Sequence, residues 1–179
     1  MRKSVAVAAV LLLAACRQPE PQNKNAASGA STNTAAAATN AAAPVTPEQA
    51  IGIFHERHEG MERIGKSTKT IGQQLKSESP DLAVIRSSAA TITDLAARSP
   101  KWFPAGTGQE VLPKTRALPA IWQKPEDFAA KDRDLRRAAN ALKTTADAGD
   151  LDAIESSFDT LGKACKACHD DYRAEEHPQ

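Results

Sequence analysis

The sequence predicts an all-α protein, an antiparallel bundle of four helices, from two observations. Apolar residues recur at alternating spacings of three and four in four separate segments between residues 46 and 173, the pattern of helices that bury one face. Sustained apolar–polar alternation and Asn-Gly turns, which would indicate strands and hairpins, do not occur in that stretch. Because all but the second connection are short, we expect consecutive helices to run antiparallel, with the last two as neighbours.

The first two helices have clear start signals. Thr46 can cap a helix whose first residue is Pro47, and the apolar pattern continues to about Lys76. The second helix begins after Ser79-Pro80-Asp81 and ends before Pro100. The residues expected to face inward are Ile51, Phe54, His58, Met61, Ile64, Thr68, Ile71 and Leu75 in the first helix, and Leu82, Ile85, Ala89, Ile92 and Ala96 in the second.

An irregular segment is expected from Pro100 to about Lys124. It contains four prolines, two glycines and both tryptophans of the chain, Trp102 and Trp122. A loop of this length in a small domain is usually functional or packed by its own side chains. Two interpretations stay open: the tryptophans plug the surface of the bundle, or they form a lid over something flat and apolar.

The third helix opens at Pro125 and ends before Gly149, and Asp150 caps the fourth. In the fourth helix the apolar spacing of three and four continues through both cysteines. We therefore expect both thiols on the edge of the fourth helix that faces the core. The inward residues are Phe128, Leu135, Ala139, Leu142 and Ala146 in the third helix, and Leu151, Ile154, Phe158, Leu161, Cys165, Cys168 and Tyr172 in the fourth.

The fourth helix contains the motif Cys165-Lys166-Ala167-Cys168-His169. C-x-x-C-H is the attachment pattern of a c-type haem: the two thiols form thioethers with one porphyrin, and the histidine binds the iron axially. The sequence therefore predicts one covalently bound haem c inside the bundle, near its C-terminal end, with His169 as a metal ligand.

Other fates of these residues are less well supported. A Cys165–Cys168 disulfide would be strained within one helical turn, and a zinc site would need the second ligand pair that the motif lacks. A structural lipoprotein without haem leaves the motif unexplained. The sequence contains no recognisable nucleophile–base motif that would indicate a hydrolytic enzyme. A net charge of +1 without a run of basic residues argues against nucleic-acid binding.

The N-terminus predicts export and a lipid anchor. Residues 1–15 have a charged start and an apolar run too short to span a bilayer comfortably, as in a signal peptide. Leu13-Ala14-Ala15-Cys16 resembles the lipobox of bacterial lipoproteins, so Cys16 is expected to carry lipid; an ordinary signal peptide would leave Cys16 incidental. Residues 16–45 are then a disordered tether, and residues 46–179 are the haem domain, held at the periplasmic face of an envelope membrane.

From about Thr46 to Arg173 the chain resembles cytochrome c-prime, the class II c-type cytochromes. The haem motif ends a four-helix bundle and is followed by x-x-Tyr-Arg, and residues 57–65 match the pattern Arg-x-x-x-Met-x-x-Ile-Gly. The resemblance implies that Met61 faces the distal side of the haem as ligand or lid. It also implies that Arg57 lies near the propionates and Arg173 on the proximal side; a solvated surface charge is the alternative for both arginines.

The resemblance implies two functions. In the first, the protein acts in electron transfer, in the binding of NO and CO at a five-coordinate iron, or in both. In the second, a low-spin iron with His169 and Met61 as ligands makes it an electron carrier without a gas-binding role. His58, one turn before Met61, either lies at the rim or approaches the haem. The expected partners are a small redox protein or a membrane electron-transfer chain and a diatomic gas, and a homodimer is an open oligomeric state.

Overall fold

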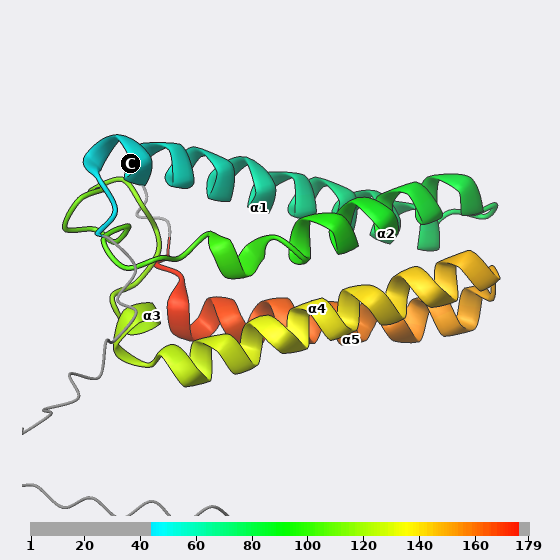
Figure 1. Cartoon of the computed structure of the whole chain (residues 1–179). Coiled ribbons are helices and arrows are strands. Elements are labelled where there is room, and N and C mark those ends of the chain that lie inside the picture. The colour runs from blue at the N-terminus through cyan, green and yellow to red at the C-terminus, as the bar shows by residue number, and fades with distance from the viewer. Residues whose placement is uncertain (1–43, 176–179) are drawn as a thin grey trace, which may run out of the picture. The chain divides into compact units, whose positions relative to one another are not determined.

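The computed structural model describes residues 44–175, and within them the long helices form an antiparallel bundle (Figure 1). No strand is present in this range; one antiparallel bridge pairs Ala117 with Arg173. The predicted all-α four-helix bundle is therefore confirmed. The elements are α1 (Pro47–Leu75), α2 (Leu82–Ala96), the 3₁₀ helix η1 (Ser99–Lys101), α3 (Ala120–Gln123), α4 (Pro125–Ala148) and α5 (Leu151–Tyr172).

The signal peptide, Cys16 and the tether up to residue 43 lie outside the described residues. Between residues 44 and 175, no helix is long and apolar enough to cross a membrane. The expectations about export and anchoring thus stay predictions.

The helix ends lie where the caps predict them. Thr46 and Gln49 form a capping box at the start of α1, each side chain bonded to the other residue's backbone. Asp81 and Asp150 cap α2 and α5 with their carboxylates. Gly149 ends α4 in the left-handed conformation, at φ 80°, which glycine adopts without steric cost.

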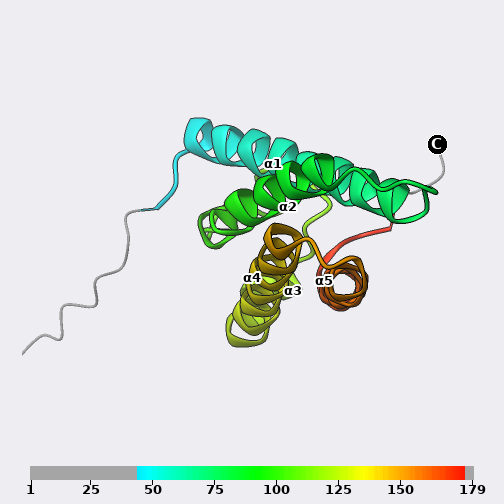
Figure 2. The same ribbon diagram turned by 90° about the vertical axis from the view of Figure 1, so that its right-hand side faces the viewer.

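The core lies between two helix pairs, α1 with α2 and α4 with α5 (Figure 2). The most deeply buried side chains are Ile71, Ile85, Ile92, Leu142, Ile154 and Leu161. Three residues predicted to face inward are exposed: Ile51 retains 49% of its surface, Leu151 retains 40%, and His58 is exposed as well. In α1 the residues just before Ile51 and His58, Ala50 and Arg57, are buried instead, so the buried face in this part of the helix is offset by one residue from the predicted one. Leu151 is the first residue of α5.

Trp102 plugs the bundle next to α1. It is 1% exposed, and a Cβ built at Gly60 would lie 2.4 Å from its ring atom Cη2. The absence of a side chain at Gly60 therefore lets the indole lie directly on the backbone of α1. Trp122 is half-buried, and its indole Nε1 donates to the carbonyl oxygens of Phe103 and Pro104 at 3.1 Å.

Replacing Gly60 by alanine is expected to destabilise the protein. The added methyl group would overlap a rigid buried ring, and overpacking of this kind costs about 1–3 kcal/mol in the free energy of unfolding. Urea unfolding measures the change. Gly52→Ala on the same helix is the control, because its Cβ would meet nothing within 4 Å and alanine is favoured in a helix by about 0.5–1 kcal/mol. Equal effects of the two variants would contradict the close packing of Trp102.

Candidate functional site

The haem motif lies on α5, near the end of the bundle that carries the long loop (Figure 1). Cys165 and Cys168 are half-buried free thiols. Cys165 packs against the main core, and Cys168 packs against a second apolar cluster at the end of the bundle, formed by Ala117, Ile121 and Tyr172. The predicted position of both thiols on the core-facing edge of the helix agrees with this packing.

The surroundings keep the motif's groups in their neutral forms. Burial raises the pKa of Cys165, and burial together with the negative charge of Asp132 raises the pKa of Cys168 to about 11. Partial burial and the positive charges of Arg173 and Arg116 lower the pKa of His169. Neutral imidazole is the form that coordinates a metal, so His169 needs to lose no proton to do so near pH 7.

Across the bundle, α1 contributes Met61. Its side chain is half-buried and packs against the same main core as Cys165. Gly65, one turn after Met61, and Gly162, one turn before Cys165, both face open space, since a Cβ at either would meet nothing within 4 Å. Two half-buried thiols, the imidazole that follows them on α5 and a thioether on α1 that borders the same core are the groups that a covalently held haem needs.

Arg57, one turn before Met61, is buried at 5% exposure rather than solvated. Its guanidinium donates to the carbonyl oxygens of Trp102 at 3.2 Å and Thr107 at 3.3 Å, and to Thr115 Oγ1 at 2.8 Å. It also lies 5.1 Å from the ring centroid of Phe103. Burial lowers the pKa of Arg57, but a guanidinium keeps its proton in proteins. Arg57 therefore fastens the long loop to α1, and its position near the propionates stays a prediction.

Arg57→Met should loosen the loop. The change would remove the donor of the Trp102 and Thr107 carbonyl oxygens, whereas Thr115 Oγ1 would still accept from Ala117 N. Because unsatisfied buried polar groups cost about 1–3 kcal/mol each, we expect a loss of about 3 kcal/mol in the free energy of unfolding. Hydrogen exchange of the amides from residue 102 to 115 should speed up with it. Arg63→Met, at an exposed arginine on the same helix, is the control and should change neither quantity. A wild-type exchange rate in the Arg57 variant would refute the fastening role.

The other end of the loop is tied to α5. Leu118 N donates to the carbonyl oxygen of Tyr172 at 3.0 Å, and Ala174 N donates to that of Arg116 at 2.8 Å. The Arg116 guanidinium also donates to the Ala174 carbonyl oxygen, from Nε at 2.9 Å. The loop thus joins the helix of Met61 to the end of the helix of His169. Reasoning from the sequence missed this pairing, because nothing in the spacing of residues 116–118 and 172–174 signals it.

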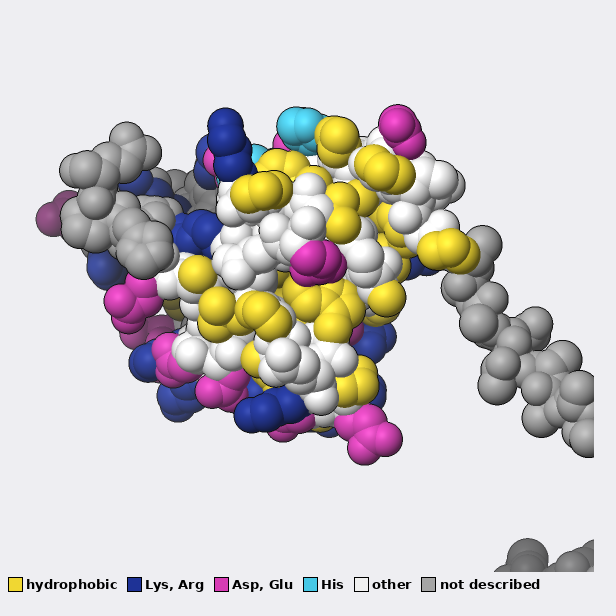
Figure 3. Space-filling model, turned by 90° about the vertical axis from the view of Figure 1, so that its left-hand side faces the viewer, with side chains coloured by type: hydrophobic (Ala, Val, Ile, Leu, Met, Phe, Trp, Pro, Cys, Tyr) yellow, Lys and Arg dark blue, Asp and Glu magenta, His cyan; other side chains and the backbone are white. Residues whose placement is uncertain are grey.

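The remaining candidates lie at the surface. Arg173 has an exposed side chain, and its backbone N donates to the carbonyl oxygen of His169 at 3.1 Å. His58 is exposed too, with Nε2 lying 3.4 Å from the Oε1 atom of Glu62. This exposure supports the interpretation in which His58 lies at the rim of the haem site, and its position relative to the haem stays a prediction. Figure 3 views the loop end of the bundle, where apolar side chains gather on the surface and Val111 is 41% exposed.

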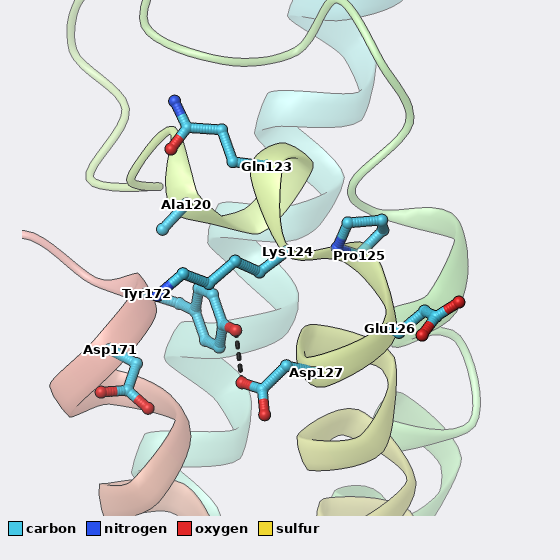
Figure 4. Close-up of a pocket in the computed structure, with 8 residues that line it drawn as sticks. All are labelled: Ala120, Gln123, Lys124, Pro125, Glu126, Asp127, Asp171 and Tyr172. Atoms are coloured by element: carbon cyan, nitrogen blue, oxygen red, sulfur yellow. Dashed lines mark hydrogen bonds between the residues drawn. The ribbon is translucent and has the colours of Figure 1, made fainter.

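Two pockets open beside this end of the bundle. One, of about 830 Å³, is lined by α3, the start of α4 and the end of α5, including Asp127 and Tyr172 (Figure 4). The other, of about 460 Å³, lies between the loop and α4 and is lined by Trp122 and Phe128 among others. Neither pocket is lined by the cysteines of the motif or by Met61.

Comparison with known proteins agrees with this geometry. The cytochrome c-prime family profile matches residues 53–173. Cytochrome c-554 of Cereibacter sphaeroides is 34% identical over 126 residues, which cover 69% of this chain and 94% of the relative.

Solved structures give the same result. The crystal structure of cytochrome c-prime from Thermochromatium tepidum superposes with a TM-score of 0.65 at 33% identity, covering 73% of this chain and 98% of the other. A nitric oxide complex of a mutant cytochrome c-prime from Alcaligenes xylosoxidans superposes with a TM-score of 0.58 at 29% identity, covering 73% and 98%.

Proposed function

Since this chain belongs to the cytochrome c-prime family and is therefore a haem c protein, we propose that it transfers electrons and binds NO or CO at a five-coordinate iron. The observation that carries the proposal is that Cys165 on α5 and Met61 on α1 border the same core cluster. Bound haem supplies a redox-active iron with a position for a small ligand. The two helices supply opposite sides of the site.

Each residue of the site has a role in the proposal. Cys165 and Cys168 hold the porphyrin through thioethers, and the neutral imidazole of His169 provides the proximal ligand. Met61 lines the distal side. Arg57 and Arg173 lie in the surroundings of the haem, where their positive charges would favour the propionates. The position of Arg57 on the same helix as Met61 and that of Arg173 one turn after His169 support these roles.

Gas binding is supported by the chemistry of the distal side. Met61 is apolar, so it offers no hydrogen bond to an anionic ligand but leaves room for small neutral molecules. A relative in this family has been solved as a nitric oxide complex. The second candidate function, a low-spin electron carrier, is favoured by the same residue, because the Met61 thioether is half-buried on the side of α1 next to the open space at Gly65.

Optical spectroscopy of the purified haem protein separates the two candidates. A broad high-spin spectrum of the ferrous protein that shifts when NO or CO is added is the result expected from the proposal. Sharp, split α and β bands that do not respond to either gas would establish the low-spin carrier instead. A purified protein without covalent haem would overturn both.

We also propose that Cys16 carries lipid and holds the domain at the periplasmic face of an envelope membrane, where it exchanges electrons with a small redox protein or a membrane chain. Two or more acyl chains give stable anchoring, whereas one gives only marginal binding. The mass of the intact membrane-extracted protein tests both covalent proposals at once. It should equal the chain beginning at residue 16 plus one haem and the acyl groups.

A further inference from the structure

Tyr172 is the single tyrosine of the chain, and its environment is unusual for a surface helix end. It is 3% exposed, and its hydroxyl donates a hydrogen bond to the Oδ2 atom of Asp127 (Figure 4). The Phe128 ring meets it edge-on, with the ring centroids 5.2 Å apart. The first turn of α4 therefore packs the phenol and also provides its hydrogen-bond acceptor.

Asp127 connects this buried phenol to solvent. Asp127 is exposed, and together with Tyr172 it lines the pocket of about 830 Å³. The other acidic residues around this pocket are Glu126, which points away from Tyr172 (Figure 4), and Asp171. Asp171 is paired with Lys131, with Nζ 2.9 Å from Oδ2. A proton that reaches Asp127 can therefore leave through the pocket without crossing the core.

The hydrogen bond to Asp127, followed by burial, raises the pKa of Tyr172 to about 12. The phenol is thus fully protonated near neutral pH. Loss of an electron turns a phenol into a very strong acid, so oxidation at ordinary potentials requires a base within hydrogen-bond reach. The Asp127 carboxylate is such a base, because it already accepts the hydrogen bond of the Tyr172 hydroxyl.

Tyr172 is also close to the expected haem attachment. It follows Cys168 by four residues, a rise of about 6 Å along the helix, and Cys168 packs against the same apolar cluster as Tyr172. An electron donor at this position would lie one helical turn from a thioether of the cofactor.

We propose that Tyr172 and Asp127 form a redox-active pair beside the haem attachment site, a function beyond gas binding and beyond electron transfer by the iron. The oxidant is a strong outer-sphere metal complex, of the ruthenium(III) polypyridyl class: it takes one electron from the Tyr172 phenol, and the phenolic proton moves to the Asp127 carboxylate. The products are a neutral tyrosyl radical, a protonated Asp127 and the reduced oxidant, so charge and atoms balance.

The test uses the ferric haem protein and an added oxidant, photogenerated tris(bipyridine)ruthenium(III), with electron paramagnetic resonance of frozen samples. A tyrosyl radical is expected in the wild type and should be lost in Tyr172→Phe. Asp127→Asn keeps an acceptor oxygen but removes the base, so radical formation should slow at least about tenfold, which corresponds to about 1.4 kcal/mol in barrier. It should also slow in D₂O, which a merely structural hydrogen bond would not cause.

Glu126→Gln is the matched control, because it removes a neighbouring carboxylate from the same pocket without touching Tyr172, and it should leave the radical yield unchanged. A radical that persists in Tyr172→Phe, or one that forms at the wild-type rate in Asp127→Asn, would overturn the pair. Haem content and the optical response to NO, read on the same samples, test the proposed function separately. A protein that loads haem and binds NO but gives no tyrosyl radical refutes only the pair.

Discussion

Replacing Cys165 and Cys168 together by alanine is expected to abolish covalent haem attachment and to destabilise the bundle. Both thiols border the core of the protein, so a haem held there shields apolar surface of α1 and α5 as well as its own. If about 400 Å² of apolar surface returns to water, the loss is on the order of 10 kcal/mol at about 25 cal/mol/Å². Because alternative packing offsets part of this, we expect a decrease of at least about 3 kcal/mol.

The measurements are haem retention after denaturing extraction and urea unfolding of the purified variant. The single variant Cys165→Ala separates the two effects, because the thioether at Cys168 and the ligand His169 remain. That variant should keep haem through one bond and lose less stability than the double variant. A double variant that unfolds at the wild-type urea concentration would mean that the bundle does not depend on the cofactor.

The parts of the fold that local chemistry determines could be predicted from the sequence. Caps such as Thr46, Asp81 and Asp150 act on amides two or three residues away, and the helices begin where these residues are placed. The inward-facing residues of α2 and α4 were predicted well, because both helices pack against neighbouring helices along most of their length. The same rule failed at Leu151, the first residue of α5, and at Ile51 and His58, because the buried face of α1 runs one residue earlier there, through Ala50 and Arg57.

The parts that depend on contacts distant in sequence could not be predicted. The fastening of residues 102–115 by Arg57 spans 45 to 58 residues, and the bond from Tyr172 to Asp127 spans 45. Neither has a local signature. The long loop also contains two short helical pieces, η1 and α3, which are too short for a periodic pattern to indicate them.

The candidate site divides in the same way. Cys165, Cys168 and His169 form a contiguous motif, so the sequence alone identified them. The place of Met61 depended on the resemblance, and the structure adds that it borders the same core as Cys165. Arg57 was expected either near the propionates or in solvent; its side chain is buried under the loop, so the solvated alternative is wrong and the position near the propionates stays a prediction. A buried cation whose hydrogen-bond acceptors are all neutral oxygens could not be anticipated from a single arginine in a helix.

Replacing Met61 has the largest expected effect on ligand binding, and two substitutions separate its roles. Met61→Leu conserves volume but removes the thioether, whereas Met61→Ala removes both. If the iron is five-coordinate, as proposed, the leucine variant should keep the high-spin spectrum and the CO binding rate of the wild type. The alanine variant should keep the spectrum but bind CO about tenfold faster or more, because a barrier lower by about 1.4 kcal/mol gives that factor.

The opposite pattern identifies a ligand. If the Met61 sulfur binds the iron, both variants should convert a low-spin spectrum to a high-spin one, because leucine cannot donate to a metal however well it fills the space. Stopped-flow CO binding and ferrous spectra of the three proteins give both readings in one series. Identical spectra and rates in all three would remove Met61 from the distal side altogether, since a residue that neither binds the iron nor limits access to it cannot line that site. Because Met61 is the only methionine other than Met1, no second thioether can mask the result.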